Sequence, residues 1–153
     1  MEFPFSSAVV SFHLHATEDE QRVVAAFRNF LLSSIEIKRS RTKGHHGNPI
    51  LIFEARINQK KALKEIWRRL LSGLRADEFD KFILKVPERI DESCFFYLRF
   101  DKQAAYGGEL IPTETGDAIH FRFKIAAFPP KREVAVELVK KFLEDRGKHG
   151  AEA

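Results

Sequence analysis

Apolar and polar side chains alternate along two stretches of the chain, residues 9–16 and 118–127. Successive side chains of a β-strand point to opposite faces of a sheet, so this alternation predicts two strands that are each buried on one side. Apolar stretches with a less regular alternation predict three further strands, over residues 35–41, 50–57 and 93–101.

Between these strands, apolar residues recur three and four positions apart, as on the buried side of a helix. The first predicted helix begins at a capping box, Thr17–Glu20, whose two end residues each accept a hydrogen bond from the other's backbone N–H. It continues to about residue 33. The second helix covers residues 59–72 and has Asn58 as its predicted N-cap.

Two more helices are predicted in the second half of the chain. A short helix within residues 75–91 stops before Pro87, because the residue that precedes a proline avoids helical geometry. The last helix covers residues 131–146 and ends at Gly147, since glycine is the commonest residue just past a helix C-terminus.

The predicted elements follow the order strand, helix, strand, strand, helix, helix, strand, strand, helix. Loops at 42–49 and 103–117, both with glycine and proline, join strands that are neighbours in the chain. The predicted fold is therefore α+β, with a largely antiparallel five-stranded sheet and helices packed on one face. We expect one domain over residues 1–147 and a frayed tail at 148–153.

The composition agrees with one such domain. Of the 153 residues, 44% are apolar, and 15 are phenylalanine, which is enough for a core at this length. No apolar run is long enough to span a membrane, and the first residues lack the features of a signal peptide. The single cysteine, Cys94, cannot form an internal disulfide. We therefore expect a cytoplasmic protein with no membrane contact.

Basic residues are concentrated in one segment, although the net charge of the whole chain is only +4. Residues 38–69 contain ten Lys or Arg and two acidic residues, Glu54 and Glu65, which gives this segment a net charge of +8. Such a segment attracts a polyanion at long range. The alternative is the solvated surface of a thermophilic protein, but acidic and basic residues would then be interspersed.

The polar sides of the predicted strands would meet on the face that the helices leave open. That face would carry polar, cationic and aromatic side chains: His13, His15, Glu54, Arg56, Phe95, Tyr97, Arg99, Asp101, His120, Arg122 and Lys124. Bases of single-stranded RNA stack on aromatic rings while basic side chains hold the phosphates. Alternatively, a loop or a second copy of the chain covers Phe95 and Tyr97.

The loop at 41–49 is a second candidate contact for phosphate. Glycines surround His45 and His46 there and let backbone amides approach a phosphate closely. The loop lacks the Gly-Lys-Ser/Thr of a P-loop, the six histidines lack zinc-ligand spacing, and no nucleophile elbow occurs. We therefore predict no enzyme, no cofactor and no metal. A nuclease that uses histidines and scattered acids is the third alternative.

Four motifs in order resemble an archaeal family of predicted RNA-binding, exosome-associated proteins: Phe12–Asp19, Gly44–Ile50, Leu98–Ala105 and Phe128–Glu133. The resemblance covers about residues 7–146. It implies a fold similar to that of a large-subunit ribosomal protein that contacts 5S RNA, and a role in RNA processing near the exosome. It brings no catalytic residues.

These observations together predict an RNA-binding module that holds phosphates through residues 38–69. The predicted contacts are cations, histidines and one tyrosine: Lys38, Arg39, Arg41, Lys43, His45, His46, Arg56, Lys60, Lys64, Arg68, His13, His15, Tyr97, Arg99, Lys102, His120, Arg122 and Lys124. The alternative is a non-catalytic adaptor, either a homodimer or a subunit docked on the exosome or another RNA-processing assembly.

Overall fold

The computed structural model describes residues 3–15, 18–31, 34–44, 47–114 and 116–150. The predictions made for Ala16, Thr17, His45 and His46 therefore lie outside the described residues. In chain order the elements are β1 (Phe5–His15), α1 (Glu20–Arg28), β2 (Lys38–Lys43), β3 (Pro49–Ile57), α2 (Lys60–Gly73), α3 (Ala76–Leu84), the 3-10 helix η1 (Val86–Arg89), β4 (Phe95–Asp101), α4 (Lys102–Tyr106), β5 (Ala118–Ile125) and α5 (Arg132–Gly150).

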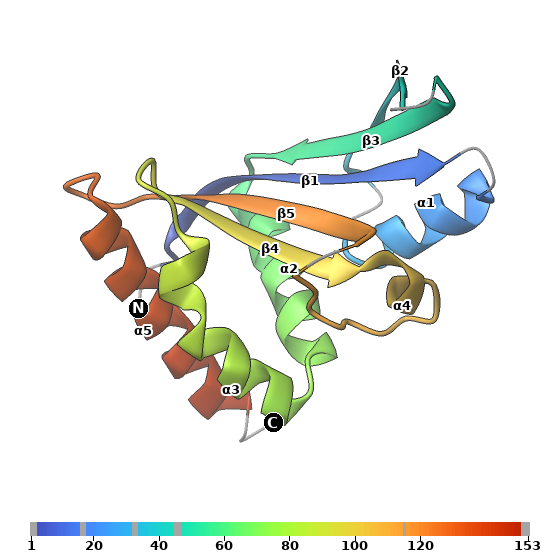
Figure 1. Ribbon diagram of the computed structural model, residues 1–153. Coiled ribbons are helices and arrows are strands. Elements are labelled where there is room, and N and C mark those ends of the chain that lie inside the picture. Colours follow the sequence, from blue (N-terminus) through green and yellow to red (C-terminus); the bar gives the residue numbers. More distant parts are fainter. Residues whose placement is uncertain (1–2, 16–17, 32–33, 45–46, 115, 151–153) are drawn as a thin grey trace.

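The five strands form one sheet in the order β2-β3-β1-β5-β4, and every neighbouring pair is antiparallel. Figure 1 shows α1, α2, α3 and α5 on the same side of this sheet, and none of the described helices covers the opposite side. The predicted α+β class, with a five-stranded antiparallel sheet and helices on one face, is confirmed. None of the described helices is long and apolar enough to cross a membrane.

The core lies between the sheet and the helices and is rich in aromatic rings. Trp67 of α2 lies at its centre, with ring centroids 4.9 Å from Phe5 and 4.8 Å from Phe123. Phe12 and Phe53 stack on neighbouring strands, 4.9 Å apart. Phe12, Phe53 and Phe123 occupy the inward positions that the alternation predicted, because a strand of period two directs every second side chain to the same layer.

The first helix is shorter than its apolar periodicity predicts. Asp19 is the N-cap, and its carboxylate accepts from the N–H groups of Gln21 and Arg22. The helix ends at Arg28, because Asn29 and Phe30 donate to carbonyls only three residues back and so tighten the chain into turns. The predicted continuation to residue 33 was wrong.

Two local predictions around the middle helices also fail. The N-cap of α2 is Gln59, whose side chain makes no capping hydrogen bond, and not Asn58. The predicted loop at 103–117 contains the short helix α4, which Asp101 caps by accepting from the Ala104 N–H at 2.9 Å. Aspartate is a strong N-cap residue, so the Asp101 side chain was the local signal for this helix.

Several strand and helix boundaries in the structure differ from the predicted ones. β1 begins at Phe5, four residues before its predicted start, and β2 covers Lys38–Lys43 where 35–41 was predicted. The last helix passes through Gly147 and continues to Gly150, so the predicted C-cap at Gly147 was wrong.

Candidate nucleic-acid interface

The bare side of the sheet presents rows of side chains that run across β4, β5 and β1. The register pairs Tyr97 with Arg122 and Arg99 with His120, and Ser11 of β1 lies opposite His120. Residues opposite each other on neighbouring strands share a face. The structure therefore brings together the outward residues of β4, β5 and β1 that the sequence suggested. We call this bare side the open face.

Two cations lie over the aromatic ring at one corner of the open face. The Arg122 guanidinium lies 4.9 Å and the Lys124 ammonium 4.6 Å from the centroid of the Phe95 ring. The ring centroid of Tyr97 is 6.5 Å from that of Phe95, and Tyr97 is 40% exposed. Phe95 is thus partly covered by its own neighbours, and Tyr97 is the ring with more surface free for stacking.

Histidine and arginine side chains occupy the middle of the open face. Burial, together with the positive charges of Arg99 and His13, lowers the pKa of His120. Its imidazole is therefore neutral at pH 7 and has one donor and one acceptor nitrogen for hydrogen bonds. His13 is exposed, and Arg99 donates to the Gly116 carbonyl at 3.2 Å.

The basic strand β2 divides its cations between the two faces of the sheet. Lys38 lies opposite Glu54 in the register and so belongs to the open face. Arg39 lies opposite the buried Phe53 and forms an ion pair with Glu20 of α1 at 3.0 Å. The same alternation places Arg41 and Lys43 on the side of Arg39. The four cations of this segment therefore do not form one surface.

The cations of α2 lie in the helical layer, on the far side of the sheet from the open face. Lys60, Lys64 and Arg68 are all exposed there. Hydrogen bonds from Arg68 and Arg69 lower the pKa of Glu65 to about 2. On the open face, Arg56 forms an ion pair with Glu54 at 2.9 Å. Both acids of the 38–69 segment are thus paired with its arginines.

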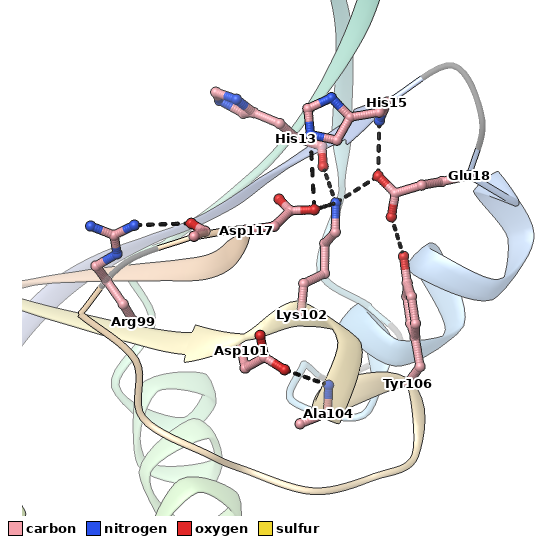
Figure 2. Close-up of polar contacts among 10 residues, drawn as sticks. His13, His15, Glu18, Arg99, Asp101, Lys102, Ala104, Tyr106 and Asp117 are labelled. Carbon is pink, nitrogen blue, oxygen red and sulfur yellow. Dashed lines mark hydrogen bonds and ion pairs between the residues drawn. The ribbon is translucent and has the colours of Figure 1, made fainter.

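Lys102, one of the predicted RNA contacts, is buried beneath one end of the open face. Only 1% of the residue is exposed. Its ammonium donates to the His13 carbonyl at 2.6 Å and lies 2.8 Å from Glu18 and 2.7 Å from Asp117. Figure 2 shows these contacts converging on the Lys102 ammonium. All three of its N–H donors are used, so Lys102 is a structural residue and cannot reach RNA in this conformation.

The carboxylates around Lys102 also meet a histidine. Ligand atoms of His15, Glu18 and Asp117 all lie within 4.8 Å of one another, a spacing that suits a metal ion. The Lys102 ammonium, however, already contacts both carboxylates. It supplies the positive charge that a metal ion would otherwise bring, so the chemistry of this cluster is that of an internal ion pair.

Glu18 should make the stability of the fold depend on pH. Burial raises its pKa, but hydrogen bonds from Lys102, Tyr106 and the His15 N–H outweigh burial and lower it to about 2, from an ordinary value of 4.5. The ionised form therefore stabilises the fold above about pH 4.5, by roughly 2–3 kcal/mol, and this contribution is lost as the pH falls toward 2.

Urea unfolding of the wild type and Glu18→Gln over a pH series measures this contribution. The difference in unfolding free energy should be largest near neutral pH and should shrink toward pH 2. Glu137→Gln, at an exposed position of α5, is the matched control and should follow the wild type. A difference for Glu18→Gln that stays constant with pH would contradict the assignment.

A hollow that was not predicted from the sequence lies beside the free edge of β4. Its lining comes from η1, from the loop that follows η1, from β4 and from the loop before β5. No local sequence pattern marks such a place, because segments far apart in the chain build it.

The sheet is antiparallel, has helices on one side and carries basic and aromatic side chains on the open face. These features define a class of protein that presents one sheet surface to a ligand. The chain belongs to the family described as RNA binding, whose model matches residues 7–125. It is 38% identical over 137 residues to the RNA-binding protein PAB1135 of Pyrococcus abyssi. The aligned region covers 86% of this chain and 88% of that protein.

Solved structures of similar proteins share the fold. Mth689, a DUF54 protein from Methanothermobacter thermautotrophicus, is 35% identical with a TM-score of 0.79, and the match covers 92% of this chain and 99% of that one. Protein AF2318 from Archaeoglobus fulgidus is 32% identical with a TM-score of 0.81, over 90% of this chain and 98% of that one.

Proposed function

We propose that this protein binds unpaired RNA across its open face. The observation that carries the proposal is the corner where Arg122 and Lys124 flank Phe95, with the half-exposed ring of Tyr97 beside them. Unpaired bases stack on such rings while cations hold the backbone. Membership of the RNA-binding family, and the name of the Pyrococcus abyssi relative, support the same function.

Phosphates would meet the cations that share the open face. Arg122 and Lys124 lie at the β4–β5 corner, and Arg56 and Lys38 lie on the outward side of β3 and β2. A strand of RNA that crosses the sheet would pass from one pair to the other over Val9 and Ser11 of β1, with His120 beside its path. Hydrogen bonds from the neutral His120 and from Ser11 would then reach bases or 2′-hydroxyls.

The remaining cations of the 38–69 segment would contribute to phosphate binding mainly at long range. Arg41 and Lys43 extend along the exposed edge strand, and Lys60 and Lys64 lie in the helical layer. Cations that do not touch the RNA still raise the local concentration of a polyanion and its association rate. The basic segment would thus draw RNA toward the protein, while the open face binds it.

The binding would be non-catalytic, and the protein would act together with an RNA-processing assembly such as the exosome, or on ribosome-related RNA. Support for the first point comes from Lys102, whose ammonium lies between Glu18 and Asp117, the carboxylates best placed for a metal ion among the described residues. Support for the second comes from the motifs shared with exosome-associated proteins and from Phe128, 92% exposed, which offers an apolar contact to a partner protein.

Removal of charge at the corner of the open face tests the proposal. Fluorescence anisotropy with an unstructured RNA over a salt series would compare the wild type with Arg122→Gln/Lys124→Gln. We expect about tenfold weaker binding and a salt slope smaller by about 1.4, because two phosphate contacts with a single strand are lost.

The matched control is Lys81→Gln/Lys141→Gln, which removes the same charge at exposed positions of α3 and α5, outside the basic segment. It should keep the salt slope and most of the affinity. Equal losses in both variants would mean that net charge alone attracts the RNA. If the wild type binds neither the unstructured RNA nor a hairpin, the adaptor function becomes the better explanation.

A further inference from the structure

The hollow beside β4 has a volume of about 280 Å³. Its polar lining consists of Glu88, Arg89, Asp91, Tyr97, Arg99 and Glu114. Tyr97 and Arg99 are also part of the open face, so a group attached to RNA on that face can enter from it. Sites for drug-sized ligands usually measure about 300–1,000 Å³, and this volume therefore suits a single small ring system.

Two loops border the hollow and occupy both ends of the free edge of β4. At one end the Asp91 N–H donates to the Phe95 carbonyl at 3.0 Å. At the other end the Thr113 N–H donates to the Arg99 carbonyl at 3.0 Å, and the Asp101 N–H donates to a loop carbonyl at 2.8 Å. Among the described residues, the edge is left open only between these two ends, which leaves room for one group and not for an added β-strand.

Tyr97 lies at the centre of that opening. In an antiparallel ladder the N–H and C=O of one residue point to the same side, and successive residues alternate. Because Phe95 and Arg99 direct backbone groups to the free edge, Tyr97 does so as well. No hydrogen bond joins the Tyr97 backbone to either bordering loop among the described residues. The hollow therefore has a backbone donor and a backbone acceptor side by side.

The side chains of the hollow disfavour an anion and leave one carboxylate without a partner. Asp91 accepts from the Phe95 N–H and the Tyr97 hydroxyl, and Glu114 pairs with Lys85 and Arg89. Glu88 is exposed, and no described residue contacts its carboxylate through a hydrogen bond or ion pair. The cations of the hollow are engaged with Glu114 and with the Gly116 carbonyl, so they favour a phosphate little, whereas the free Glu88 carboxylate would accept from a neutral N–H donor.

We propose that this hollow takes one unpaired nucleobase that carries an exocyclic amino group. The proposal rests on RNA binding by the open face and adds a base preference to it. One hydrogen of the amino group would donate to Glu88 and the other to the Tyr97 carbonyl, while the ring nitrogen beside the amino group would accept from the Tyr97 N–H. Uracil presents a carbonyl oxygen where cytosine presents its amino group, so two acceptors, this oxygen and the Glu88 carboxylate, would face each other without a donor.

Anisotropy titrations with two RNAs of equal length test this preference. One is an oligouridylate, and the other is the same chain with a single internal cytidine, so both carry the same number of phosphates. The wild type should bind the cytidine-containing RNA about fivefold to tenfold more tightly. Glu88→Gln should lose this preference, because a glutamine amide presents both a donor and an acceptor. It should bind the oligouridylate at least as tightly as the wild type does, because a carboxylate no longer faces the carbonyl.

Glu92→Gln is the matched control, since it removes the same charge from an exposed position nearby that does not line the hollow. It should keep the wild-type preference. Equal binding of the two RNAs by the wild type would overturn the hollow as a base site while RNA binding itself stands. A preference that survives in Glu88→Gln, or that Glu92→Gln also abolishes, would likewise overturn it. Failure of the wild type to bind either RNA would overturn the proposed function and this inference with it.

Discussion

Replacing Lys102 with methionine should destabilise the fold by about 3–5 kcal/mol, the usual cost of removing one partner from a buried ion pair. The Lys102 ammonium contacts Glu18, Asp117 and the His13 carbonyl, and methionine has no donor for any of them. Two carboxylates would then face each other without a counter-charge. Urea unfolding at pH 7 measures the loss directly.

Two further variants separate the loss of the ion pair from the loss of a lysine. Lys60→Met replaces an exposed lysine and should change the unfolding free energy by less than about 0.5 kcal/mol. Lys102→Met combined with Glu18→Gln and Asp117→Asn should recover part of the stability, because no unpaired buried charge remains. A single Lys102→Met variant as stable as Lys60→Met would contradict the structural role of the ammonium.

Trp67→Ala should cost about 3–5 kcal/mol, because it leaves a cavity at the centre of the aromatic core. Trp67→Phe should cost clearly less. The Trp67 Nε1–H is buried and has no hydrogen-bond partner among the described residues, and an unmade hydrogen bond of this kind costs about 1–3 kcal/mol. Phenylalanine keeps a ring against Phe5 and removes the unpaired donor.

Circular dichroism is the suitable measurement for this pair, since Trp67 is the single tryptophan of the chain and its fluorescence disappears in both variants. Thermal or urea unfolding should rank the wild type first, Trp67→Phe second and Trp67→Ala last. Equal losses for the two variants would mean that the indole shape, and not ring burial as such, holds the core together.

The sequence predicted the parts of the fold that a regular pattern encodes. In β1 and β5 the alternation is strict, so both the strands and their buried faces were predictable. The end of α1 was not, because the apolar spacing runs on through Phe30 and Leu31, which are buried without being helical. Arg69 of α2 accounts for part of this: it donates to the Leu31 carbonyl at 2.9 Å, from a position that no local pattern connects to α1.

The residues of the candidate site were predictable in strands where apolar and polar side chains alternate, because the alternation shows which side of the sheet each residue faces. They were unpredictable in strands without that alternation. Arg122 lies between the buried Phe121 and Phe123, and Lys124 lies between Phe123 and the buried Ile125, which fixes their side of the sheet. In β2 all six residues are polar and exposed, so the sequence carried no signal for which cations share a face. Lys102 resembled a surface lysine because its burial depends on Glu18 and Asp117, whose positions only the folded chain defines.

The outer edge of β2 has a consequence for how copies of this protein behave at high concentration. Within the part of the chain that the structure describes, the strand pairs only with β3, and its other edge leaves backbone N–H and C=O groups unpaired. Antiparallel approach of a second β2 would bring Lys38, Arg39, Arg41 and Lys43 against the same cations, and like charges opposite each other weaken such pairing. At low ionic strength these charges keep the molecules apart as colloidal particles, whereas high salt or an excess of polyanion screens them and lets two edges meet.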